Sequence, residues 1–270
     1  MKLQGSRILL VGATGGIGRE LSRRLLREDA RLCLTGLTEE ELEELHRSLE
    51  NEPGEFFTLR ADVTNATDRK RCLAAMEEKL GGIDILLNLA GINAFVPFDL
   101  QDPGQIERIV QVNLLAPMLM AHTVLPPMLE AGRGLIVNVG STFGSIGYPC
   151  FTAYSASKFA LRGFSQALRR ELAGYGVGVV YIAPRAVKTP MNPPEVYAVA
   201  RRVGMRFDAP ETVAEKIVEA IRKEQKECYI GFPESFFVRI NALAPAMVDS
   251  SLNRQNRVLR EYATPPATTK

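Results

Sequence analysis

Tyr154 and Lys158 stand four residues apart in the stretch YSASK, where the residue types most directly suggest chemistry. Positions i and i+4 share one face of an α-helix, so both side chains point to one place if the stretch is helical. Tyrosine, with a pKa of about 10, is too weak an acid for efficient proton transfer near neutrality. A lysine ammonium about 4 Å away is worth about 4 kcal/mol at an effective dielectric constant near 20, enough to lower that pKa to about 7. The pair is therefore a candidate general acid and base; the alternative is a surface pair without function.

A glycine-rich stretch, GATGGIG at residues 12–18, follows the first apolar run. Gly12, Gly16 and Gly18 fit the pattern G-x-x-x-G-x-G, whereas G-x-G-x-x-G is not matched. Positions without a side chain let the backbone approach a pyrophosphate, and the N-terminus of the following helix offers free N–H groups and partial positive charge. A Walker loop is excluded because Arg19-Glu20 stands where Lys-Ser/Thr is needed. The stretch predicts a dinucleotide site; the alternative is a tight strand-to-helix turn.

The elements that must position these residues alternate along the chain. Short, continuous apolar runs are typical of strands buried on both faces of a parallel sheet, and amphipathic segments fill the gaps. This order predicts an α/β fold, a Rossmann-like doubly wound, mostly parallel seven-stranded sheet with helices on both faces. We expect strands at 7–12, 31–36, 55–60, 83–91, 134–140, 177–184 and 227–232, and helices at about 16–28, 38–50, 65–80, 103–130, 152–173 and 210–224.

The composition is ordinary for a soluble globular protein. Of 270 residues, 46% are apolar and 24% are charged, and the net charge of +2 gives no reason to expect nucleic acid as a partner. The four cysteines are widely spaced, which indicates free thiols and no metal site. No signal peptide or transmembrane span is expected. We expect a single domain over residues 1–262 and a disordered tail at 263–270.

Seven motifs occur in one order along the chain. They are GATGGIG (12–18), DVT (62–64), NLAG (88–91), VNLLAP (112–117), NVGS (138–141), YSASK (154–158) and APRAVKTP (183–190). In combination they resemble the short-chain dehydrogenase/reductase family, in its short single-domain branch, over about residues 5–230. The resemblance implies an NAD(P)(H)-dependent oxidoreductase that interconverts a ketone or aldehyde and an alcohol by hydride transfer.

The resemblance also implies the site residues. Its Asn-Ser-Tyr-Lys tetrad falls on Asn113, Ser141, Tyr154 and Lys158, with Ser141 placed 13 residues before Tyr154 as is usual in the family. Tyr154 would be the general acid and base, Ser141 would hydrogen-bond the substrate oxygen, and Asn113 would help to hold a water that relays protons past Lys158. The cofactor contacts would come from Gly12, Thr14, Gly15, Gly16, Ile17, Gly18, Asp62, Val63, Asn88, Ala90, Gly91, Tyr154, Lys158, Pro184, Val187 and Thr189. The alternatives are a strand-end cap for Asp62 and a loop residue for Thr189.

Three positions depart from the family pattern. Val11 replaces a threonine, Leu89 replaces an asparagine, and Arg185 replaces the glycine of the usual Pro-Gly after the sixth strand. The third departure is expected to alter how the following segment leaves the sheet.

The cofactor preference is read from the end of the second strand. An acidic residue about 20 positions after the glycines would bind the ribose 2′-OH of NAD, but Gly36 and Leu37 occupy this place. The arginine that NADP-dependent members often carry there is missing too. Thr35, Thr38 and the helix N-terminus could bind a 2′-phosphate, whereas the glutamates at 39–41 oppose one. The missing acid slightly favours NADP(H) over NAD(H).

Two C-terminal segments bear on partners. Residues 188–209 would cover the substrate; their apolar residues predict a fairly hydrophobic substrate, and Arg201, Arg202 and Arg206 suggest an anionic group on it. An amphipathic helix is expected at 233–260, bent at Pro245, with Phe236, Ile240, Leu243 and Met247 on one face. This face would pack on its own chain or a partner subunit; the alternative is peripheral membrane contact through residues 232–248.

Two other functions are compatible with a nucleotide site. One is a non-catalytic nicotinamide-nucleotide sensor, and the other is an extended-type epimerase or dehydratase, which GATGGIG would also suit through Gly12, Gly15 and Gly18. The second would need a larger C-terminal substrate domain. A cytoplasmic homodimer or homotetramer acting on a small-molecule carbonyl or alcohol is expected by family analogy.

Overall fold

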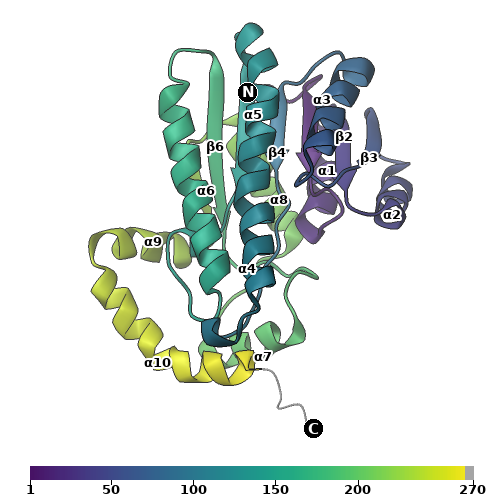
Figure 1. Ribbon diagram of the computed structural model, residues 1–270. Coiled ribbons are helices and arrows are strands. Elements are labelled where there is room, and N and C mark those ends of the chain that lie inside the picture. Colours follow the sequence, from purple (N-terminus) through teal and green to yellow (C-terminus); the bar gives the residue numbers. More distant parts are fainter. Residues whose placement is uncertain (265–270) are drawn as a thin grey trace.

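The computed structural model describes residues 1–264 and contains one parallel sheet of seven strands. The strand order is β3-β2-β1-β4-β5-β6-β7, and every neighbouring pair is parallel. Helices cover both faces (Figure 1). This confirms the doubly wound, Rossmann-like α/β fold. The strands are β1 Arg7–Val11, β2 Arg31–Gly36, β3 Phe56–Arg60, β4 Ile85–Asn88, β5 Gly134–Val139, β6 Val177–Pro184 and β7 Glu227–Ile230.

Two hydrophobic layers hold the helices against the sheet. Successive strand side chains point to opposite faces, so Ile8 and Leu10 of β1 join one layer while Leu9 and Val11 join the other. The first layer packs against α1, α2 and α8, and the second against α3, α5 and α6. The helices are α1 Gly16–Arg27, α2 Glu39–Leu49, α3 Ala66–Leu80, α4 Pro103–Val110, α5 Ala116–Glu130, α6 Thr152–Glu171, α7 Pro194–Val203, α8 Pro210–Arg222, α9 Glu234–Leu243 and α10 Pro245–Ala263.

The helix expected over 103–130 is interrupted. A π-helical turn, Gln111–Leu115, separates α4 from α5, and the Ala116 N–H donates to the carbonyl of Gln111, five residues back. Pro117 has no N–H to give the carbonyl four residues before it, which favours the wider turn. By length and composition alone this stretch could cross a membrane. However, α5 packs on α3, β4 and β5 and buries side chains such as Met120 and Val124, so it is a layer helix of the domain.

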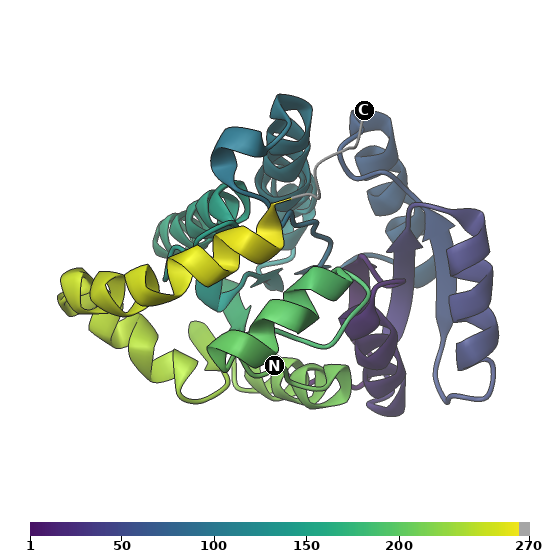
Figure 2. The same ribbon diagram turned by 90° about the horizontal axis from the view of Figure 1, so that it is seen from below.

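The C-terminal third differs most from the expectation. Residues 188–209 contain α7, which the sequence analysis missed although Pro194 at its first turn and left-handed Gly204 at its end are ordinary boundary signals. The helix expected at 233–260 is two helices, because Ala244 (φ −144°, ψ 67°) leaves the helical region before Pro245. α10 continues to buried Ala263, inside the expected tail; residues 265–270 lie outside the described part. Seen from below, α9 and the start of α10 form an arm that projects from the body, while the rest of α10 lies back over α7 (Figure 2).

Candidate active site

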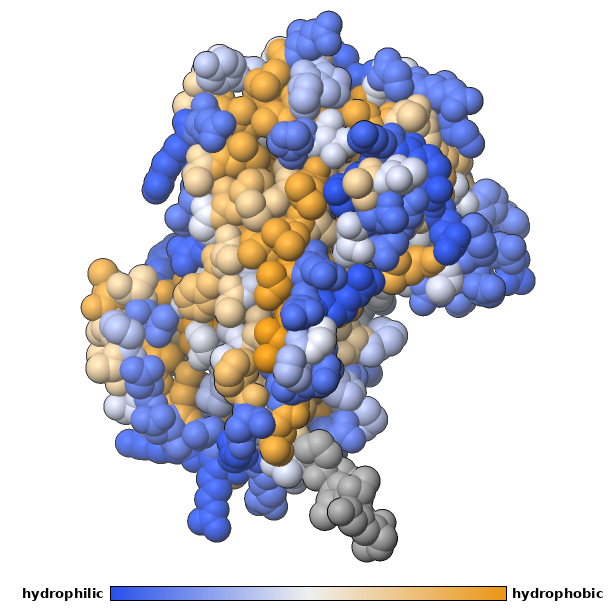
Figure 3. All heavy atoms as spheres, in the orientation of Figure 1, coloured by the Kyte–Doolittle hydropathy of each residue, from blue (hydrophilic) through white to orange (hydrophobic). Residues whose placement is uncertain are grey.

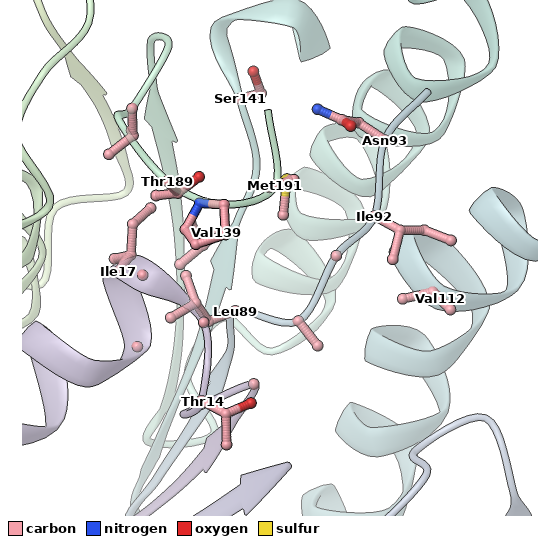
Figure 4. A pocket seen from close by; sticks show the side chains of 18 of the residues that line it. Thr14, Ile17, Leu89, Ile92, Asn93, Val112, Val139, Ser141, Thr189 and Met191 are labelled. Carbon is pink, nitrogen blue, oxygen red and sulfur yellow. The ribbon is translucent and has the colours of Figure 1, made fainter. Parts of the chain in front are cut away.

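A cavity of about 740 Å³ opens at the carboxyl ends of the strands. β1 lies between β2 and β4, so the chain reverses its winding direction there, and ligands of open α/β sheets bind at such switch points. Figure 4 shows Thr14 at one end of the cavity, and Ser141 and Asn93 at the other. Residues at or just after the carboxyl ends of six strands line it: 11–12, 35–37, 61–64, 89–93, 139–141 and 184–187.

The glycine turn forms the floor of one half of this cavity. Gly12 has φ +89°, and a Cβ there would lie 2.7 Å from the backbone of Ala90. A Cβ on Gly18 would lie 2.4 Å from the carbonyl oxygen of Gly12, so neither position accepts a side chain. α1 begins immediately after Gly15, with no side-chain cap and no acidic residue in its first turn. Its first N–H groups and its positive dipole end are thus available to a pyrophosphate, and the turn fits a dinucleotide.

Asn113 is fully buried behind the cavity wall, in the π-helical turn. Its Nδ2 donates to the Ile92 carbonyl (2.8 Å) and to Ser157 Oγ (3.1 Å), while its Oδ1 accepts from the Ile92 N–H (2.9 Å). Ser157 Oγ in turn donates to the carbonyl of Tyr154 (2.7 Å). Asn113 therefore joins the loop after β4 to the first turns of α6, which carry Tyr154 and Lys158.

Ser141 directly follows β5 and lines the cavity. Its Oγ accepts from the N–H of Phe143 (3.1 Å), and its carbonyl accepts from the hydroxyl of Tyr181 (3.3 Å). The Tyr181 ring lies against Gly140 and Gly144, where any Cβ would come within 2.6 Å of it. Tyr181 thus fixes the turn that presents Ser141, a contribution from β6 that the sequence motifs did not indicate.

Tyr154 and Lys158 both line the cavity from the first turns of α6, as their spacing predicts. Lys158 Nζ lies 5.8 Å from the centroid of the Tyr154 ring and donates to the carbonyl of Val139 (3.1 Å). Burial lowers the pKa of Lys158 to about 8. Burial also raises the pKa of Tyr154 to about 12, against a smaller lowering by its hydrogen bond with Ser141.

The expectation that Lys158 lowers the Tyr154 pKa toward 7 is therefore wrong for the protein without ligand. Loss of solvation is the largest influence on the pKa of Tyr154, and it raises this pKa. At neutral pH the structure thus presents a protonated tyrosine beside a largely protonated lysine.

Most residues predicted to contact the cofactor line this one cavity. Asp62 does so while its carboxylate accepts hydrogen bonds from the N–H (2.9 Å) and hydroxyl (2.6 Å) of Thr64. These bonds, with nearby Arg108, hold its pKa below the usual range although burial acts in the opposite direction. The other predicted residues that line the cavity are Gly12, Thr14, Gly15, Gly16, Ile17, Gly18, Val63, Ala90, Gly91, Pro184, Val187 and Thr189.

Asn88 is the exception among the predicted cofactor contacts. It is buried at the end of β4, and its Nδ2 donates to Asn138 Oδ1 of β5 (2.9 Å). Asn138 Nδ2 donates onward to Ser165 Oγ of α6 (2.9 Å). Asn88 therefore lies behind the cavity wall, in a hydrogen-bonded chain that joins two strands and a helix.

The half of the cavity away from the glycine turn is apolar, and the sequence motifs did not predict which residues form it. Its wall comes from the loop after β4, the turn after β5, the start of α6 and the segment around α7: Ile92, Phe143, Phe151, Met191, Val196 and Met205. Arg201, Arg202 and Arg206, which suggested an anionic group on the substrate, are exposed and do not line it. The positions of these three arginines therefore give no support to an anionic group on the substrate.

Arg185, which stands where the family pattern has glycine, connects three segments of the chain through its guanidinium. Its guanidinium donates to Asp208 Oδ1 (2.6 Å), after α7, and to Glu234 Oε2 and the Phe232 carbonyl (both 3.1 Å), at the start of α9. Its stem fills the space beside Gly231, where a Cβ would lie 2.5 Å from Arg185 Cδ. The expected change in how the chain leaves the sheet thus takes the form of an ion-paired junction of β6, the α7 segment and the C-terminal arm.

Comparisons with known proteins agree with this geometry. Residues 6–198 match the family model described as short chain dehydrogenase. The chain is 30% identical over 254 residues to the ketoacyl reductase HetN of Nostoc sp., which covers 92% of this chain and 88% of that protein. It is 32% identical over 223 residues to the 3-oxoacyl-(acyl-carrier-protein) reductase FabG of Thermotoga maritima, with 81% and 91% covered. A crystal structure of levodione reductase superposes with a TM-score of 0.76 at 26% identity, covering 84% of this chain and 96% of that one.

Proposed function

Because the chain belongs to the short-chain dehydrogenase/reductase family and is an NAD(P)-dependent oxidoreductase, we propose that it interconverts a hydrophobic ketone or aldehyde and its alcohol. The observation that carries the proposal is the meeting of Ser141, Tyr154 and Lys158 in one cavity, between the glycine turn and an apolar wall. A nucleotide sensor would not need this acid, base and hydroxyl beside an apolar pocket.

The residues present fit a nicotinamide cofactor. The turn at 12–18 and the start of α1 would hold the pyrophosphate; residues 62–63 and 90–91, with Thr189, would line the rest of the cofactor's length. When bound, the cofactor supplies or accepts the hydride.

Tyr154 is the proposed proton donor and acceptor. The hydroxyl, whose pKa burial raises to about 12, carries its proton at pH 7 and gives it to the carbonyl oxygen as that oxygen gains negative charge and becomes the stronger base. The tyrosinate left behind is stabilised by the Lys158 ammonium, whose Nζ lies 5.8 Å from the centroid of the tyrosine ring. Ser141 donates a second hydrogen bond to the same substrate oxygen. In the alcohol-to-ketone direction the roles reverse, and the tyrosinate takes the proton.

The substrate is proposed to be uncharged and hydrophobic where it meets the far half of the cavity. Phe143, Phe151, Met191 and Met205 provide an apolar wall, which favours apolar groups and excludes unpaired charges. Steady-state assays with uncharged alkyl and aryl ketones, compared with short hydroxylated carbonyls, test this class. Higher kcat/KM for the short polar carbonyls would overturn it.

NADP(H) is proposed as the slightly favoured cofactor. No carboxylate stands at positions 36 and 37 to bind a ribose 2′-OH, and Arg19 lines this end of the cavity. Arg19 is paired with Glu44 (3.0 Å), and Glu41 accepts from Thr14 Oγ1 (3.2 Å), so the preference is small. The test is kcat/KM with NADPH and with NADH; a higher value with NADH would reverse it.

We further propose that the chain is a homodimer or homotetramer. α5 and α6 expose Leu119, Leu129 and Phe159, the turn before α5 exposes Leu115, and Figure 3 shows a hydrophobic stripe over this part of the surface. A stripe of moderately exposed side chains on two neighbouring helices suits packing against a second copy. Light scattering after size-exclusion chromatography tests this, and a monomer at micromolar concentration would contradict it.

A further inference from the structure

The arm formed by α9 and α10 carries a second apolar surface, separate from the α5/α6 stripe. The three most exposed large hydrophobic side chains of the described residues, Leu243 (88%), Phe232 (73%) and Met247 (67%), lie within this arm or directly before it. Phe236 (53%) and Phe237 (44%) lie between them, and Val238 is the one buried residue of α9. Exposed apolar residues are ordinary when scattered, but a contiguous group indicates an interaction surface. We call residues Phe232, Phe236, Phe237, Leu243 and Met247 the arm ridge.

The fold holds the arm ridge outward. Asn241 Nδ2 donates to the Ser145 carbonyl (2.8 Å), and Glu234 pairs with Arg185 (3.1 Å), so the inner side of α9 is tied to the turn after β5 and to the end of β6. Phe236 and Leu243 are seven residues apart and share the opposite face. Figures 1 and 2 both show the corner between α9 and α10 as an extremity of the molecule, so the ridge is free to approach a large, flat object.

The segment that carries the arm ridge, residues 232–248, exposes few charges. Among the exposed side chains of residues 232–248, Arg239 carries the one formal charge, because Glu234 is partly buried and ion-paired. The next acidic residue, Asp249, lines a cleft against the start of α6. Within residues 232–248 the large apolar side chains stand beside one cation and no exposed carboxylate, and exposed Asp249 follows on α10; this segment is complementary to a lipid surface with negative headgroups.

We propose that the arm ridge inserts into the surface of an anionic bilayer. The arm ridge lies at a protruding corner, which suits insertion into a lipid surface, whereas the α5/α6 stripe lies flat along the body, which suits a second copy. The ten residues of α9 are too few to span a bilayer, so the contact is interfacial, with Arg239 at the level of the headgroups. The proposal does not depend on the reaction in the cavity.

Flotation of the full-length protein with vesicles tests this directly. The vesicles are phosphatidylcholine alone, or phosphatidylcholine with phosphatidylglycerol. Wild type is expected to float with the mixed vesicles. The double variant Phe236→Ser/Leu243→Ser should lower the partition coefficient at least about tenfold. Arg239→Glu should lower it about fivefold or more, and only for the anionic vesicles. Tyr175→Ser is the matched control: Tyr175 is 62% exposed and follows α6, so partitioning should not change.

Each outcome supports or contradicts the insertion of the arm ridge into a bilayer. Melting temperature and cofactor-induced stabilisation of every variant show whether it is folded. Absence of flotation by wild type, or equal flotation by the folded double variant, overturns the proposal. If wild type does not float and the double variant instead lowers the oligomer mass in light scattering, the ridge belongs to a subunit contact and the lipid proposal is wrong.

Discussion

Replacing Arg185 by alanine should lower the free energy of unfolding by much more than an ordinary surface substitution does. The side chains of Arg185 and Asp208 are only 13% and 14% exposed, and their atoms meet at 2.6 Å. Removing the guanidinium also leaves the Glu234 carboxylate, whose side chain is 28% exposed, without this ion-pair partner. Breaking a buried pair from one side costs about 3–5 kcal/mol, and the partial exposure of Glu234 places this site near the lower end. At about 2–4 °C per kcal/mol, the loss of about 3 kcal/mol lowers Tm by about 6–12 °C.

Urea unfolding of four variants measures this coupling. Arg185→Ala, Asp208→Asn and their double variant form a mutant cycle, and Arg260→Ala breaks an exposed pair with Asp99 as a control. The double variant should be less destabilised than the sum of the singles, because the second change removes the charge that the first left unpaired. Arg260→Ala should be far less destabilising than Arg185→Ala, because both side chains of the Arg260–Asp99 pair are more than half exposed. If Arg185→Ala lowers the free energy of unfolding by less than about 1 kcal/mol, or if the effects of the two single variants simply add, Arg185 and Asp208 do not stabilise the protein as a buried pair.

Three further predictions concern the cavity. Burial lowers the pKa of Lys158 to about 8, so its ammonium is lost as the pH rises through this value. The kcat/KM for ketone reduction should therefore fall above about pH 8, and a flat profile to about pH 10 would contradict this. Gly18→Ala should abolish the melting shift with NADPH, whereas Gly163→Ala, whose Cβ on the exposed side of α6 would meet nothing within 4 Å, should keep it; equal shifts would refute the steric account. Tyr181→Phe removes the 3.3 Å hydrogen bond to the Ser141 carbonyl and should lower kcat about 2- to 12-fold with cofactor binding unchanged; loss of cofactor binding instead would speak against a role through Ser141.

The sheet could be predicted from the sequence because its signals are local. Buried parallel strands are continuous apolar runs, and β2 and β6 begin and end where the runs RLCLTG and VGVVYIAP do. The spacing of Tyr154 and Lys158 also brought both into the cavity, since one helix carries them.

Long-range features were not available to this reasoning. The pKa of Tyr154 depends on burial by segments far away in the chain, so the local spacing of Lys158 predicted its direction wrongly. The Asn88 side chain turned toward Asn138 because β4 and β5 are neighbours, which the motif does not show. Pro245 predicted a bend at the right place, although not two separate helices, and the boundaries of α7 had proline and glycine signals that were not used.

The central claim is that Tyr154 moves the proton in a cavity that binds a nicotinamide cofactor. The most direct test compares wild type with Tyr154→Phe in the reduction of uncharged ketones, and in melting with saturating NADPH or NADH. Because phenylalanine removes only the hydroxyl, the melting shift of about 5–10 °C expected at 100 times Kd should remain. The kcat should fall at least about 100-fold, the lower end of what a general acid contributes. A Tyr154→Phe variant that binds cofactor and reduces ketones at the wild-type rate would contradict the account.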